Sequence, residues 1–117
     1  INNEGIFMPN VTIFTPPSHF VQNHDSKVMF MRECTDICTA VLGAEENKVH
    51  IIFVNVLESF TGKDAYIEIK FRYSDQRTQE VMNKFMQLLE NIYIHYFSKQ
   101  PRIRCFAYQA ENIFARN

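Results

Sequence analysis

Four stretches of the chain have the residue pattern of β-strands. The clearest is Tyr66–Arg72, where apolar residues alternate with polar or charged ones at every second position. Asn10–Thr15 and Ile103–Tyr108 alternate in the same way, and Val49–Leu57 is a nearly unbroken apolar run of strand length. Because such a run is typical of a strand covered on both sides, we expect Val49–Leu57 to be a central parallel strand.

Two further stretches repeat apolar residues with the 3.6-residue period of an amphipathic helix. The first begins at a capping residue, Asp25 or Ser26, and ends at Gly43. The second begins at Ser74 or Asp75 and is the longer and more strongly amphipathic of the two. Its apolar face is formed by Val81, Phe85, Leu88, Leu89, Ile92 and Tyr96.

The predicted order is strand, helix, strand, strand, helix, strand, so the two halves of the chain repeat one unit. A strand–helix–strand crossover pairs its two strands in parallel. We therefore expect an α+β fold with a β-α-β-β-α-β pseudo-repeat, in which a four-stranded mixed sheet carries both helices on one face. Ferredoxin-like folds share this element order, so the architecture alone leaves the function open.

The size and charge of the chain narrow its function. We expect 117 residues to form a single domain, 1–117, with 1–7 as an extension or an addition to the chain. A net charge of −1 gives no attraction to nucleic acid or to an anionic membrane, and no apolar run or signal peptide directs the chain to a membrane. Three cysteines, an odd number, favour a reducing compartment, so we expect a cytoplasmic protein.

No motif for a cofactor or a metal is present in the sequence. The three glycines form neither a dinucleotide-binding motif nor a phosphate-binding loop. Cys34 and Cys38 lie one helical turn apart, but no third ligand completes a metal site, so we expect them to pack in the core. His50 and His95 lie in apolar stretches and are expected in the core or at its rim. We therefore predict neither a cofactor nor a metal.

One residue offers unusual chemistry. Pro9 opens the first predicted strand, a position at which proline is tolerated, and the simplest interpretation is that it only begins this strand. If Met8 is the initiator and is removed, however, Pro9 becomes a free secondary amine, which can act as a general base or a nucleophile near neutral pH. If the residues before Pro9 remain, its nitrogen is an amide and this chemistry is absent.

Three cations complete the candidate site. Lys70 and Arg72 share one face of their strand, and their simplest interpretation is that this face meets solvent. Arg77 lies near the start of the second predicted helix, where the helix terminus is already positive. This unfavourable position suggests that an anionic group, either a carboxylate or a ligand, lies near Arg77.

The residues Met8-Pro9 before a doubled β-α-β unit resemble the tautomerase superfamily, which includes macrophage migration inhibitory factor and 4-oxalocrotonate tautomerase. The stretches Tyr66–Arg72 and Asp75–Val81 resemble small bacterial members of unknown function in that superfamily. The resemblance implies a homotrimer in which three sheets surround an axis with the helices outside. Such an assembly would also cover the apolar tail residues Ile113 and Phe114.

The resemblance also implies an isomerase activity, the keto–enol tautomerisation of a small 2-oxo acid at a subunit interface. Pro9 matches the catalytic proline, while Arg77, Lys70 and Phe106 are the candidates for binding the substrate carboxylate and its surroundings. Lys48 is the nearest candidate for a further cation before the second strand. The alternative is a non-catalytic trimeric binding or scaffold protein of the same fold, which the residues ahead of Pro9 and the incomplete cationic pocket favour.

Overall fold

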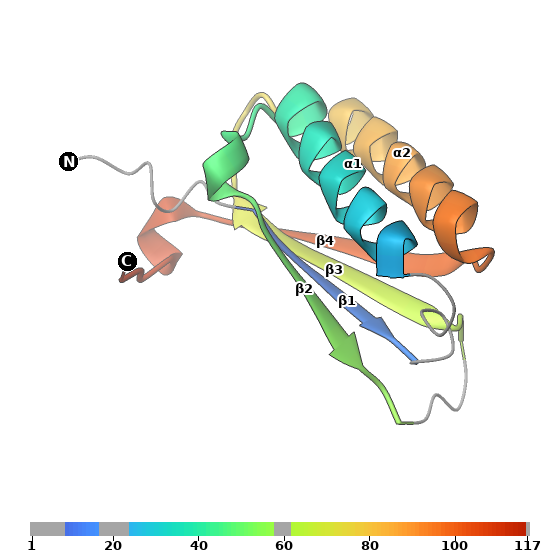
Figure 1. The fold of residues 1–117 in the computed structure, drawn as a ribbon. Coiled ribbons are helices and arrows are strands. Elements are labelled where there is room, and N and C mark those ends of the chain that lie inside the picture. The colour runs from blue at the N-terminus through green and yellow to red at the C-terminus, as the bar shows by residue number, and fades with distance from the viewer. Residues whose placement is uncertain (1–8, 17–23, 58–61, 117) are drawn as a thin grey trace.

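The computed structural model describes residues 9–16, 24–57 and 62–116 (Figure 1). Four strands and two long helices follow one another in the predicted order. Two short 3₁₀ turns are added to them, one before the second strand and one after the last. In chain order the elements are β1 (Asn10–Thr15), α1 (His24–Leu42), η3 (Glu46–Lys48), β2 (His50–Asn55), β3 (Ala65–Arg72), α2 (Gln79–Phe97), β4 (Pro101–Tyr108) and η4 (Ala110–Asn112).

The four strands form one mixed sheet in the order β2-β1-β3-β4. Within each half of the chain the strands are parallel, β1 with β2 and β3 with β4, as crossover connections require. The halves meet where β1 and β3 pair antiparallel at the centre of the sheet. Both helices cover the same face, side by side (Figure 1). The predicted α+β fold is therefore confirmed.

The prediction for the second strand was wrong. Val49–Leu57 was expected to be a central strand buried on both faces, but β2 lies at the edge of the sheet and pairs only with β1. Only one side of β2 packs against the core, through Ile51 and Phe53, whereas Ile52 is 41% exposed. The apolar run therefore reflects an edge strand whose outer residues are apolar.

The core lies between the helices and the sheet. Phe30 of α1 and Tyr93 of α2 meet edge to face, with their ring centroids 5.6 Å apart. Cys34 and Cys38 are fully buried in the same layer, which confirms that they pack in the core. Their mutual hydrogen bond, together with burial, raises the pKa of the Cys34 thiol well above its ordinary value. The Cys34 thiol is therefore held neutral, whereas the same hydrogen bond lowers the pKa of Cys38.

The helix ends differ in part from the predictions. α1 begins at His24, so Asp25 lies in its first turn, and it ends as expected before Gly43, which has a φ of 71°. The predicted caps of the second helix were wrong, because α2 begins after Thr78. The Thr78 hydroxyl accepts a hydrogen bond from the backbone N–H of Val81 at 3.3 Å. Ser74 lies in the preceding turn, where its hydroxyl accepts from the N–H of Gln76.

Candidate functional site

The sheet surface opposite the helices, which we call the open face, carries alternate residues of all four strands. It is the side of the sheet away from α1 and α2 in Figure 1. On the two central strands, β1 and β3, side chains on this face are half-buried or exposed, whereas their neighbours on the helix side are buried. By register its residues are His50, Ile52 and Val54 of β2; Asn10, Thr12 and Phe14 of β1; Tyr66, Glu68, Lys70 and Arg72 of β3; and Arg102, Arg104, Phe106 and Tyr108 of β4.

Pro9 lies immediately before β1, as predicted, and is fully buried. Its carbonyl oxygen accepts a hydrogen bond of 3.0 Å from the N–H of His50, which continues the parallel β1–β2 ladder by one residue. The position lies two residues before the buried Val11, and therefore on the helix side of the strand. The first residue of the candidate site is thus buried and hydrogen-bonded at one end of the sheet.

The structure brings Lys70 and Phe106 together beside this end of β1. They are direct neighbours across the parallel β3–β4 pair. On its other side Lys70 pairs with Asn10, the residue after Pro9. His50 continues the same row beyond Asn10 and is exposed, so the expectation of a core or rim position was wrong for its side chain.

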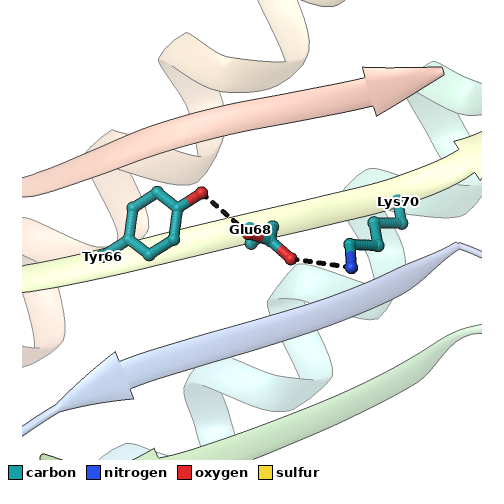
Figure 2. Close-up of polar contacts among 3 residues, drawn as sticks. All are labelled: Tyr66, Glu68 and Lys70. Carbon is teal, nitrogen blue, oxygen red and sulfur yellow. Dashed lines mark hydrogen bonds and ion pairs between the residues drawn. The ribbon is translucent and has the colours of Figure 1, made fainter.

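Lys70 is already engaged by a carboxylate (Figure 2). Its ammonium lies 3.1 Å from Glu68, whose other oxygen accepts a hydrogen bond of 2.8 Å from the Tyr66 hydroxyl. The hydrogen bond from Tyr66 and then that from Lys70 lower the pKa of Glu68, and the same pair raises the pKa of Lys70. The ammonium is therefore charged, and any substrate carboxylate would compete with Glu68 for it.

Arg77 lies before the cap of α2, and its guanidinium contacts two backbone carbonyls. Nε and Nη2 donate to the Leu42 carbonyl at 3.3 and 3.1 Å, and Nη1 donates to the Arg72 carbonyl at 2.8 Å. Leu42 is the last residue of α1, so the guanidinium lies at the negative end of that helix. The partners of Arg77 among the described residues are thus neutral backbone carbonyls at a helix end, and not the carboxylate or ligand that its position suggested.

Arg77 and Lys70 lie on opposite sides of the sheet. The Arg77 guanidinium lies 5.2 Å from the centre of the Phe71 ring, which is buried on the helix side. Arg77 and Phe71 both line a hollow of about 510 Å³ between α2 and β4, on the helix side of the sheet. Burial lowers the pKa of the guanidinium. Within one subunit, the two predicted substrate-binding cations therefore do not converge.

The open face contains cations that the sequence analysis did not single out. Arg102 and Arg104 precede Phe106 at alternate positions of β4, so all three share one side of the strand. The alternation of this strand carries the signal, because it places Arg102, Arg104 and Phe106 on one side. Lys48, the further cation proposed, ends the 3₁₀ turn before β2.

Two other expectations concern metals and membranes. Within 9–16, 24–57 and 62–116, no group of three or more histidine, cysteine or acidic side chains is arranged to hold a metal ion. No helix of these segments is long and apolar enough to cross a membrane.

No protein-family model matches the chain, and no curated protein matches it in sequence. Solved structures do match. A macrophage migration inhibitory factor-like protein from Entamoeba histolytica aligns with a TM-score of 0.71 and 16% identity, over 93% of this chain and 96% of that one. N1, a member of the cis-3-chloroacrylic acid dehalogenase family, aligns with a TM-score of 0.77 and 10% identity, over 91% and 79% of the two chains.

A third match is a fused 4-OT wild-type symmetric trimer, which aligns with a TM-score of 0.70 and 15% identity over 94% of this chain and 92% of that one. A domain of unknown function from Sebaldella termitidis aligns comparably, with a TM-score of 0.68 and 14% identity over 92% and 95% of the chains. Since all identities are low, the agreement concerns the fold. The chain therefore has the fold of the tautomerase superfamily. This is the superfamily whose pattern the sequence resembles at Met8-Pro9 and in its doubled β-α-β order.

Proposed function

We propose that this chain is a tautomerase-like protein that interconverts the keto and enol forms of a small 2-oxo acid. The observation that carries the proposal is the position of Pro9, directly before the central strand β1 of a tautomerase-type sheet, at the end where the next residue, Asn10, pairs with Lys70. Pro9 lies on the helix side of the sheet and Lys70 on the open face. The activity belongs to a form of the chain that begins at Pro9, because only then is its nitrogen a basic amine.

In this form the Pro9 nitrogen removes a proton from the carbon next to the substrate carbonyl and returns it to the carbonyl oxygen. Pro9 lies on the helix side of the sheet, next to core residues of β1, and apolar surroundings lower the pKa of an amine because they disfavour its charged form. A lowered pKa lets the amine act as a base near neutral pH. The reaction moves one proton and needs no cofactor.

Lys70 is our candidate for holding the substrate carboxylate, and Phe106 for contacting the apolar part of the substrate. Lys70 is charged and exposed, and Phe106 is its direct neighbour on β4. We assign Arg77 a positioning role, because its N–H groups hold the end of α1 against the end of β3. That contact fixes Phe71, which lies opposite Pro9 in the continued register.

We also propose a homotrimer. The similar fused 4-OT protein is described as a symmetric trimer. In a single copy of this chain, β2 and β4 are sheet edges with unpaired backbone groups, and Phe114 is 94% exposed. Closed cyclic assembly is a common way of covering such edges and apolar residues.

The test compares two forms of the chain, one beginning at Pro9 and one retaining residues 1–8, for phenylpyruvate tautomerisation followed by ultraviolet absorbance. Turnover is expected only in the form that begins at Pro9, and Pro9→Ala in that form should lower kcat/KM by about 100-fold or more, the usual contribution of a general base. Pro101→Ala is the matched control, since Pro101 is also buried at the start of a strand. Equal turnover in both forms would contradict the role of the amine.

A non-catalytic trimeric binding or scaffold protein of the same fold is the second candidate. Its support is the engagement of both candidate cations, Lys70 by Glu68 and Arg77 by backbone carbonyls. In that case phenylpyruvate would bind without turnover in either form of the chain, and Pro9→Ala would leave both binding and assembly unchanged. Turnover that depends on Pro9 would exclude this candidate.

A further inference from the structure

The charges of the chain are distributed unevenly over its surface. In the described strands, the open face carries four of the twelve lysines and arginines of the chain, Lys70, Arg72, Arg102 and Arg104, but only one of its thirteen acidic residues, Glu68. Since the whole chain has a net charge of −1, the remainder is acidic. The near-neutral composition therefore conceals one cationic surface.

By strand register, three of these cations are near neighbours on the open face. Arg104 pairs with Glu68 across β3 and β4, which makes Arg104 the diagonal neighbour of Lys70. Strand spacing and rise place diagonal neighbours roughly 8 Å apart, a distance that two long side chains span. Arg102 is two residues from Arg104 on the same side of β4. The three side chains can therefore converge.

The single carboxylate of this surface does not neutralise the arginines. Both oxygens of Glu68 are used, one by Tyr66 and one by Lys70 (Figure 2). Among the described residues, Arg104 donates to the carbonyl of its own neighbour Ile103, and neither Arg104 nor Arg102 forms an ion pair with a carboxylate. A guanidinium presents five N–H donors in a plane, a geometry that matches the oxygens of a phosphate group.

We propose that the open face binds a small multivalent oxyanion of the phosphate class, held by Arg102, Arg104 and Lys70. In the proposed trimer the open faces of three copies would surround the axis, and their like charges would repel unless an anion lies among them. An apolar partner would bury the arginines without counter-charges, at high cost. An anion with two or more charges satisfies all three cations. The proposal rests on the open face alone and is independent of Pro9 and of turnover.

The probe is pyrophosphate, titrated into the ¹⁵N-labelled full chain while sodium chloride keeps the ionic strength constant. Saturable shifts are expected at amides of β3 and β4. Arg104→Gln should weaken binding by about fivefold or more, because it removes a charged donor. Glu68→Gln should tighten binding about two- to fivefold, because Lys70 loses its competing carboxylate. Lys84→Gln, which removes an exposed cation from α2, is the matched control and should leave binding unchanged.

Two results would overturn the proposal. One is the absence of saturable shifts at millimolar pyrophosphate, or an equal weakening by Lys84→Gln and Arg104→Gln, because binding would then follow overall charge alone. The other is a complex with the single-stranded oligonucleotide dT15 in the absence of pyrophosphate binding, which would identify a nucleic acid as the partner. Amide spectra of the variants verify that each one folds. The phenylpyruvate assay does not enter the result, so the two proposals stand or fall separately.

Discussion

The guanidinium of Arg77 joins the two halves of the fold by donating two hydrogen bonds to the carbonyl of Leu42, 35 residues earlier in the chain. Leu42 ends α1 in the first half, whereas Arg77 precedes α2 in the second. A third bond, to the Arg72 carbonyl, holds the end of β3 in the same cluster. Arg77 therefore satisfies carbonyls that the termini of two elements leave open.

Arg77→Lys should destabilise the protein, because a single ammonium group cannot reproduce the forked contact with two carbonyls. Hydrogen bonds from charged groups contribute about 1.5–3 kcal/mol, so we expect a loss of about that size in the free energy of unfolding. Urea denaturation measures it. Arg104→Lys is the control, because among the described residues the hydrogen bond of Arg104 goes to the carbonyl of its own neighbour Ile103, and it should change stability by less than about 0.5 kcal/mol. Equal losses would contradict this role of Arg77.

The Thr15 and Tyr93 hydroxyl groups form a buried hydrogen bond of 3.0 Å between the end of β1 and the C-terminal part of α2. Both residues are fully buried. A double-mutant cycle with Thr15→Val and Tyr93→Phe should give a coupling energy of about 1 kcal/mol, the usual net value of such a bond. The cycle is measured by urea denaturation. Additive losses would mean that the two hydroxyl groups act independently.

The residues that directly follow the two long helices have left-handed backbone conformations. Substitutions there test the conformational free energy that such a backbone costs. Ser98 follows α2 with a φ of 56°, and Gly43 follows α1 with a φ of 71°. Ser98→Gly should stabilise the protein and Gly43→Ala should destabilise it, each by roughly 0.5–1 kcal/mol, since only glycine adopts this region without strain. A Cβ at Gly43 would have no heavy atom within 4 Å, so the effect there is purely conformational. Thermal unfolding compares both with wild type, and changes of the same sign would contradict the argument.

Stability should fall as the pH rises through the alkaline range. Burial raises the pKa of Cys105 to about 12, so the folded protein keeps the proton that an unfolded thiol releases near pH 9. The neutral thiol therefore favours folding fully below about pH 9, and this contribution is lost as the pH rises towards 12. Tyr93, with a pKa raised to about 12 by burial, acts in the same direction. Cys105→Ala should flatten the decline between about pH 9 and 11 in urea titrations, and an unchanged slope would exclude Cys105 as its source.

Sedimentation equilibrium tests the assembly. We expect a species of about three times 13.8 kDa, because the edges β2 and β4 and the exposed Phe114 would be covered between subunits. Phe114→Ser should weaken the assembly, whereas Met29→Ser, which removes another exposed apolar side chain from α1, should not. A monomer at micromolar concentration would contradict the trimer and any active site that needs a second subunit.

The sequence predicted the elements and their order because the local patterns are strong. The alternation in Tyr66–Arg72 identified both sides of β3, and the helical periods identified the faces that now form the core. The position of β2 was not predictable from its own residues, because an edge strand with apolar outer residues has the composition of a central strand. Strand order depends on which partners pair, and this information is distributed over the whole chain.

The candidate site was predicted only in part for the same reason. Pro9 at the start of β1 and the pairing of Lys70 with Phe106 agree with what the strand patterns allowed. The partners of Arg77 were not predictable, since the carbonyl of Leu42 carries no sequence signal. Similarly, total charge gave no indication that cations gather on one surface, because it records how many charges are present and not where they lie.

The antiparallel contact between β1 and β3 makes the molecule an internal dimer of two half-length units. Each unit contains two parallel strands and one helix, and its apolar layer is completed by the helix and strands of the other unit. The covalent link between Asn55 and Ala65 then serves mainly to keep the units at high effective concentration. A chain severed there is expected to recover the native fold by fragment complementation, with an affinity that reports on the whole interface between the units, β1 against β3 and α1 against α2.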